Sequence, residues 1–215
     1  IPGNGLVSGS TIYPSPLSMA STFAPVLTEK ANRQTAIEMR ATGSHWAFTP
    51  NIEIARDARW GRVGETFGED PYLVSRMGVA AIRGLQTDDV TGPDKVLACA
   101  KHLVAGGVPA NGTNAGPVEL SEGGLRNIYL PPFLAAVKEA KPFTLVPAHN
   151  ELNGMPCHAN KWLMDDIMRK EYGFDGFVVS DGMDMEAISN RHKIAETVTD
   201  AFYLSVDAGV DMHMH

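Results

Sequence analysis

The chain has 215 residues, of which 44% are hydrophobic and 20% are charged, an ordinary composition for a globular domain. Its net charge of −7 argues against nucleic acid as a partner, because phosphate binding requires a basic surface. No run of about 18 apolar residues occurs, so we expect no membrane-spanning helix and no membrane partner.

Helices and strands alternate along the predicted chain. Apolar spacing of three and four residues, together with capping residues, predicts helices over residues 24–41, 70–84, 121–140, 160–172 and 193–204. Short apolar runs predict strands over residues 50–55, 95–100, 143–146, 177–179 and 208–212. Gly84 is expected to end the second helix, and the pair Pro131-Pro132 to interrupt the third.

This alternation predicts the α/β class with a parallel sheet. We expect a (β/α)8 TIM-type barrel that is incomplete in this chain, with about five to six βα units, because closed barrels typically need about 250 residues. An open doubly wound sheet is the alternative. No strand precedes a G-x-G-x-x-G or P-loop motif, which argues against a nucleotide-binding version of that sheet.

The ends of the sequence predict a fragment of a longer protein. The chain starts at Ile1 without Met or signal peptide, and its last residues, 212–215, look like the middle of a strand. The compartment therefore stays open, although a periplasmic or secreted location is favoured over a cytoplasmic one. The two cysteines, Cys99 and Cys157, cannot form a disulfide framework and are expected to be buried.

Asp181 is the first candidate for a catalytic group. It follows the apolar run 177–179, and catalytic carboxylates of α/β enzymes stand at the carboxyl ends of such strands. The alternative is that Asp181 only caps the next helix. Local sequence favours neither interpretation.

Two further strand ends carry titratable residues. Lys101 and His102 follow one predicted strand, and His149, Asn150 and Glu151 follow another. Carboxyl ends of parallel strands meet at one rim of a barrel, so these side chains are expected to gather with Asp181.

A loop of three arginines surrounds Trp60. Arg56, Arg59 and Arg62 form either a solvated loop with surface ion pairs or a polar clamp for a small ligand.

Several motifs together resemble the N-terminal barrel domain of the family 3 glycoside hydrolases, the β-glucosidase and β-xylosidase group. They are IARDARWGR at 54–62, FGEDP at 67–71, AKH at 100–102, LPPF at 130–133, HNELNG at 149–154 and GFVVSD at 176–181. They occur in the family's order and cover most of the chain.

The resemblance implies roles for the strand-end residues. Asp181 matches the nucleophile that forms a covalent glycosyl–enzyme intermediate. Lys101 and His102 match the pair that hydrogen-bonds sugar hydroxyls. The second carboxyl group that a retaining mechanism requires is assigned to no residue, although Glu151, Asp184 and Glu186 are within reach of the site.

The resemblance also implies a binding arginine. Arg62 matches it, with Arg59 the less favoured candidate, and Glu65 is expected to orient Arg62. His149 stands where many members carry Tyr or Phe, so it is expected to alter the wall of the sugar subsite. Residues 106–119 lack the His-Asp pair of the N-acetylglucosaminidase branch.

These implications predict a retaining, exo-acting β-glycosidase that hydrolyses terminal β-linked sugars of oligosaccharides or aryl and alkyl β-glycosides. No cofactor or metal is expected. Residues 1–215 are expected to form one partial barrel domain without the C-terminal α/β sandwich domain, and pairing with a second copy or a complementing chain would cover its open sheet edges. The alternatives are a non-catalytic carbohydrate-binding or scaffold chain, and a lyase using Lys101 as a Schiff base.

Overall fold

A parallel sheet forms the centre of the computed structural model, which describes residues 3–215. Ile1 and Pro2, which begin the predicted fragment, lie outside the described residues. The sheet order is β1 (Trp46–Ala47), β2 (Leu97–Leu103), β3 (Thr144–Pro147) and β6 (Phe177–Val178). Met212 extends it by a parallel bridge to Val179.

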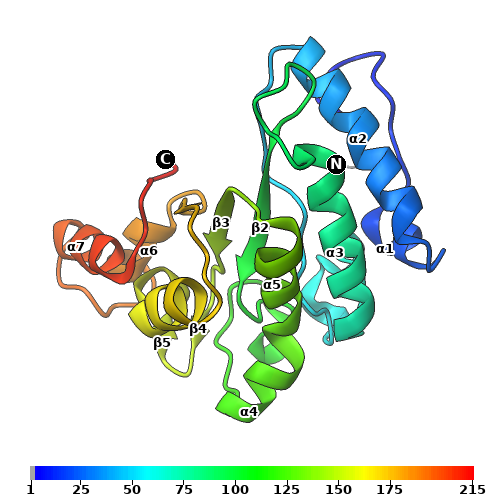
Figure 1. Cartoon of the computed structure of the whole chain (residues 1–215). Coiled ribbons are helices and arrows are strands. Elements are labelled where there is room, and N and C mark those ends of the chain that lie inside the picture. Colours follow the sequence, from blue (N-terminus) through cyan, green and yellow to red (C-terminus); the bar gives the residue numbers. More distant parts are fainter. Residues whose placement is uncertain (1–2) are drawn as a thin grey trace.

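The strands follow one another in chain order without a reversal. Figure 1 shows two of them, β2 and β3, side by side. Such an order belongs to the wall of a barrel, whereas a doubly wound sheet reverses at a switch point. The predicted α/β class and incomplete barrel are therefore confirmed, with four strands and a fifth strand position among the described residues.

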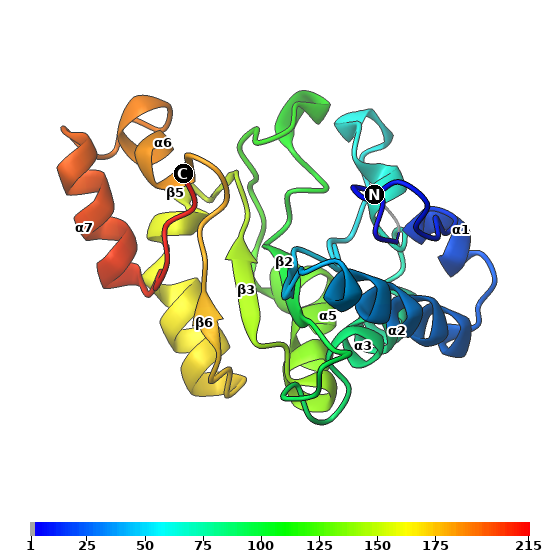
Figure 2. The same ribbon diagram turned by 90° about the horizontal axis from the view of Figure 1, so that it is seen from above.

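Helices cover the sheet and its ends. Figure 2 shows β6, β3 and β2 side by side, with α7 (Val198–Ala208) at one end of the row and α2 (Pro25–Ala41) and α3 (Pro71–Gln86) at the other. The other helices are α1 (Pro16–Ala20), α4 (Glu122–Gly124), α5 (Pro131–Ala135) and α6 (Asp184–Asn190).

Short or wide helical turns complete the chain. The 3₁₀ turns are η1 (Ala58–Trp60), η2 (Val63–Glu65), η3 (Ala110–Gly112) and η6 (Cys157–Ala159). The π-helical segments are η4 (Leu125–Tyr129), η5 (Ala136–Ala140) and η7 (Trp162–Glu171). An antiparallel pair, β4 (Glu151–Leu152) and β5 (Met155–Pro156), follows β3.

The two faces of the sheet differ. Side chains alternate between the faces of a strand, so Ala98 and Ala100 of β2 join the large core, whereas Cys99 joins a small separate cluster with Val146 and Val179. Both cysteines are buried and unpaired as predicted, and burial raises the pKa of each thiol to about 12.

The predicted strand over residues 50–55 is wrong. This segment runs beside β2, where Ile52 N donates to Lys101 O at 2.7 Å and Lys101 N donates to Pro50 O at 3.1 Å. Only Asn51 forms a ladder bridge there. Pro50 has no N–H with which to extend the ladder.

Gly84 does not end the second predicted helix, because α3 continues to Gln86. A Cβ at Gly84 would lie 2.4 Å from the carbonyl oxygen of Glu29 in α2. The glycine therefore permits close contact between two helices.

The last predicted helix and strand are displaced. The helix α7 starts after Thr197, whose hydroxyl accepts from Asp200 N at 3.1 Å, and continues to Ala208. The strand predicted over 208–212 is consequently reduced to the bridge at Met212. The unpredicted helix α6 precedes α7. Between residues 3 and 215, no helix has the length and apolar character needed to span a bilayer.

Candidate active site

Asp181 lies just beyond the carboxyl end of β6. Its backbone N–H donates to Nε2 of His158 at 3.1 Å, and its Oδ1 accepts from Gly182 N at 2.7 Å. Met183, not Asp181, occupies the position before α6 and makes no side-chain capping bond. The helix-capping interpretation of Asp181 is therefore wrong.

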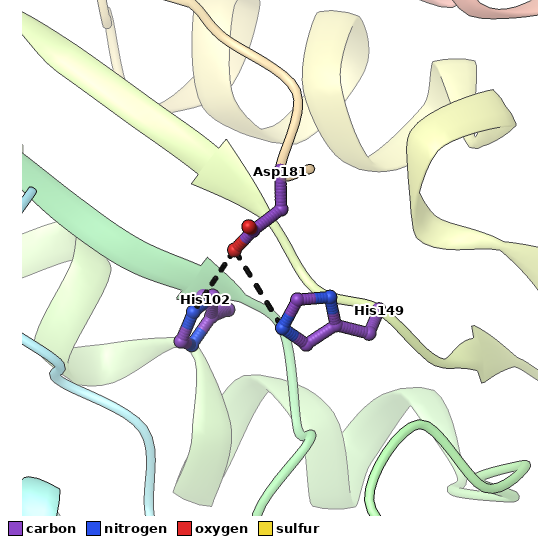
Figure 3. Close-up of side chains that lie close together, drawn as sticks. All are labelled: His102, His149 and Asp181. Atoms are coloured by element: carbon purple, nitrogen blue, oxygen red, sulfur yellow. Dashed lines mark ion pairs between the residues drawn. The ribbon is translucent and has the colours of Figure 1, made fainter. Parts of the chain in front are cut away.

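Two imidazoles face the Asp181 carboxylate (Figure 3). Nε2 of His102, from β2, lies 3.4 Å from Oδ2 of Asp181, and Nε2 of His149, from the segment after β3, lies 3.6 Å from the same oxygen. On the other side of each ring, Nδ1 contacts a second carboxylate. His102 pairs with Glu53 at 2.7 Å and His149 with Asp184 at 2.6 Å.

Arg62 lies beside both rings. Its Nη1 is 3.1 Å from Nε2 of His149, and its Nη2 is 3.5 Å from Nε2 of His102. Glu65 accepts from Nε and Nη2 of Arg62 at 3.0 and 2.8 Å. Because a guanidinium only donates, Nε2 of His149 must be the unprotonated acceptor, and its Nδ1–H is donated to Asp184.

The carboxylates on both sides of His102 favour its protonated form. Burial lowers the pKa of His102, but the charge of Glu53 and hydrogen bonds with Asp181 and Glu53 raise it more, so the net direction is upward. An imidazolium at His102 can donate to both carboxylates at once. The Glu53 side chain is only 1% exposed, so this pair is shielded from water.

The same contacts keep Asp181 ionised. Burial raises the pKa of Asp181, but the hydrogen bond from His102 and the N–H of Gly182 help to hold it well below its usual range. An ionised carboxylate that is three-quarters shielded from solvent can act as a nucleophile.

Buried groups behind the rings hold them in place. Burial lowers the pKa of His158 to about 4, so this histidine is neutral and can accept from the Asp181 backbone. Burial raises the pKa of Asp184, but hydrogen bonding with His149 lowers it more. Arg191 donates to the carbonyl oxygen of His149 at 2.6 Å and lies 3.6 Å from Asp184.

Five of the predicted site residues come together: Asp181, Arg62, Glu65, His102 and His149. Two others need separate description. Lys101 lines a neighbouring cavity of about 610 Å³ that Glu65 also lines, and within residues 3–215 its ammonium has no ion-pair partner. Arg59 lies apart from the cluster, with its side chain 69% exposed and paired to Asp57 at 2.7 Å.

Sequence reasoning missed three supporting residues. Glu53 stands between two apolar neighbours, Ile52 and Ile54, and a charge inside a buried run requires a partner, so that signal was present. Asp184 is among the carboxylates predicted to reach the site, but its partner His149 has no local signal. His158 had no local signal at all.

Comparison with known proteins places this arrangement in a family. The profile described as "Glycosyl hydrolase family 3 N terminal domain" matches residues 2–215. A β-xylosidase of Formosa agariphila is 50% identical over 210 residues, which are 95% of this chain and 29% of that protein. A periplasmic β-glucosidase of Salmonella typhimurium is 36% identical over 95% of this chain and 26% of its own length.

A solved structure agrees with these sequence matches. The β-glucosidase from Listeria innocua in complex with glucose superimposes with a TM-score of 0.91 at 36% identity, over 95% of this chain and 28% of that chain. This chain thus spans less than a third of the length of these relatives. From the profile match and the shared fold, we conclude that the chain belongs to glycosyl hydrolase family 3.

Proposed function

We propose that this chain carries the nucleophile and sugar-binding groups of a retaining, exo-acting β-glycosidase of the β-glucosidase or β-xylosidase type. The observation that supports this most strongly is the ionised Asp181 carboxylate, held at the rim of the sheet within 3.4 and 3.6 Å of two imidazoles. Two relatives carry the names β-xylosidase and β-glucosidase.

In the proposed reaction, an Asp181 oxygen attacks the anomeric carbon of a terminal β-linked sugar. The bond to the leaving oxygen breaks, and that oxygen takes a proton from an acid. Water then attacks the same carbon and releases Asp181, so the configuration is retained after two inversions.

The surrounding donors suit a ligand made of hydroxyl groups. Arg62, Lys101 and His102 offer N–H groups, and His149 forms the wall beside Asp181. In this proposal Glu65 orients Arg62 through its two short contacts. Arg59 is given no role, because its side chain is turned to Asp57.

We assign the acid/base to no residue in 3–215. Asp184 is paired with His149 and has a lowered pKa, which suits a proton donor poorly. Glu151 lies 3.5 Å from His192, and Glu186 lies 3.0 Å from His213, so each of these carboxylates pairs with another histidine. We propose that the acid belongs to a longer protein, in which residues 1–215 form one domain and a C-terminal α/β sandwich forms another.

The test is intact-mass spectrometry after incubation with 2-deoxy-2-fluoro glucosides and xylosides that carry a dinitrophenol leaving group. This leaving group departs without acid assistance, so the assignment of the acid does not affect the result. We expect one sugar adduct on the Asp181 peptide. The adduct should disappear in Asp181→Asn and persist in Asp207→Asn, a remote control with a 74% exposed side chain.

An adduct on another carboxylate would overturn the assignment of Asp181. No adduct on this chain or on a longer protein, combined with calorimetric binding of glucose or xylose, would favour the alternative of a non-catalytic carbohydrate-binding chain.

A further inference from the structure

Three side chains of the cluster offer ligand atoms at metal-binding distances (Figure 3). The facing nitrogen atoms of His102 and His149 and a carboxylate oxygen of Asp181 all lie within 4.8 Å of one another. Two of the three separations are 3.4 and 3.6 Å. In a tetrahedral zinc site with bonds of about 2.0–2.1 Å, ligand atoms lie roughly 3.3–3.5 Å apart. The two separations that involve Asp181 are therefore close to those of such an ion.

The outer contacts of the two rings also match a metal site. Metal-binding histidines commonly donate their second ring nitrogen to a carboxylate, which fixes the ring and raises its basicity. Here Nδ1 of His102 contacts Glu53 at 2.7 Å, and Nδ1 of His149 contacts Asp184 at 2.6 Å. The side chains of Glu53 and Asp184 are 1% and 6% exposed, so they add shielded negative charge beside the rings.

We propose that His102, His149 and Asp181 form a site for a divalent transition metal ion such as Zn²⁺. Two imidazoles and one carboxylate are suitable donors for this ion, and one coordination position is left for water. The site needs no second chain, because all three ligands belong to this one.

The positive charge of Arg62 competes with a metal ion for the two histidines. Its guanidinium lies 3.1 and 3.5 Å from the two nitrogen atoms that would bind the metal. An ion can enter only when Arg62 turns away with Glu65, whose side chain is 51% exposed.

A second cluster provides an internal comparison. Glu186, His213 and His215 also lie within 4.8 Å of one another, but His215 is 84% exposed and stands 3.9 Å from Glu186. No contact between either of these histidines and a second carboxylate is found within residues 3–215. We therefore assign the ion to the first cluster.

The test is titration of the whole chain with Co²⁺, whose visible absorption reports tetrahedral coordination, and with Zn²⁺ by calorimetry. We expect one bound ion, and we expect loss of binding in His149→Phe and Asp181→Asn. Asp184→Asn should weaken Zn²⁺ affinity by roughly 10–100-fold. Arg62→Met should strengthen it by roughly tenfold or more, because a nearby positive charge is removed. His213→Ala is the control and should bind normally.

Circular dichroism of each variant separates lost binding from lost folding. If His149→Phe does not fold, the opposite changes in Asp184→Asn and Arg62→Met still decide the question. Absence of binding in the parent chain, normal binding in a folded His149→Phe, or loss of binding in His213→Ala would each overturn the proposal.

A competition measurement extends the test. Under the proposed glycosidase function, Zn²⁺ and sugar need the same Asp181 oxygen, so glucose or xylose should raise the apparent Kd of Zn²⁺. The competition measurement rests on the proposed glycosidase function, whereas the Co²⁺ absorption spectrum tests the metal site independently of it. A normal spectrum without competition would therefore contradict the sugar site and leave the metal site standing.

Discussion

The cluster at the strand ends is partly exposed and the helix layer around α3 is buried, and different forces hold the two regions. In the helix layer, Met77 and Phe133 are fully buried among apolar neighbours, and Gly84 lets α2 and α3 approach closely. In the cluster, ring nitrogens and carboxylates are fixed by directed contacts such as His102–Glu53 and His149–Asp184. The first region stabilises the fold through apolar area, and the second through paired charges that also set protonation states.

This difference predicts whether a substitution should change stability or chemistry. A residue of the helix layer should alter stability with little effect on chemistry. A residue of the cluster should alter chemistry, and its effect on stability should depend on pH. Four substitutions test this separation.

Asp181→Asn should give the largest effect. Loss of the proposed nucleophile should reduce turnover of an aryl β-glucoside or β-xyloside by roughly 10³-fold or more, as for other catalytic nucleophiles. Urea unfolding should remain cooperative, because asparagine keeps the shape of the side chain. Turnover within a few-fold of the parent protein would contradict the proposed nucleophile.

Phe133→Ala should act on the fold alone. Its side chain is 0% exposed in α5, so truncation should lower the free energy of unfolding by about 3–5 kcal/mol. The measurement is urea denaturation. Tyr203→Ala, at a 72% exposed position of α7, is the matched control and should change stability by less than about 0.5 kcal/mol. Equal losses in both variants would remove the distinction between core and surface.

Glu53→Gln should lower stability by about 2 kcal/mol in a pH-dependent way. The raised pKa of His102 means that this pair stabilises the fold below the unfolded histidine pKa of about 6.5, and that the contribution disappears as the pH rises through the folded pKa. The difference between parent and variant should therefore be largest near pH 6 and shrink at higher pH.

The direct measurement is NMR titration of His102, whose pKa should fall in Glu53→Gln. Glu65→Gln, which removes a half-exposed carboxylate of the same cluster, is the comparison and should change stability less. A stability difference that grows with pH would show that the sign of this coupling is opposite.

Asp70→Ala should give the smallest effect. Oδ1 of Asp70 accepts from Leu73 N at 2.7 Å at the start of α3, and loss of such a cap costs about 1 kcal/mol. Asp70→Ser can keep the hydrogen bond and should recover most of that stability. No change in thermal or urea unfolding in either variant would show that the cap is dispensable.

Much of this molecule was predictable from short stretches of sequence. Asp70 at the start of α3, and Asn160 and Gly173 at the two ends of η7, act where local capping rules place them. Apolar runs also predicted β3 and β6. The residues after these strands, His149 and Asp181, meet because parallel strands end at one rim, so the centre of the site followed from the pattern.

Only the tertiary structure decided which groups became partners. Glu53 and His102 are 49 residues apart, and His149 and Asp184 are 35 apart, so no local rule pairs them. The role of Gly84 likewise depends on α2, a separate helix. Periodicity and capping act over one or two turns, and the sequence alone therefore determined most of the elements and the rim residues. Charge states and supporting contacts depend on how elements far apart in the chain pack, and only folding settles them.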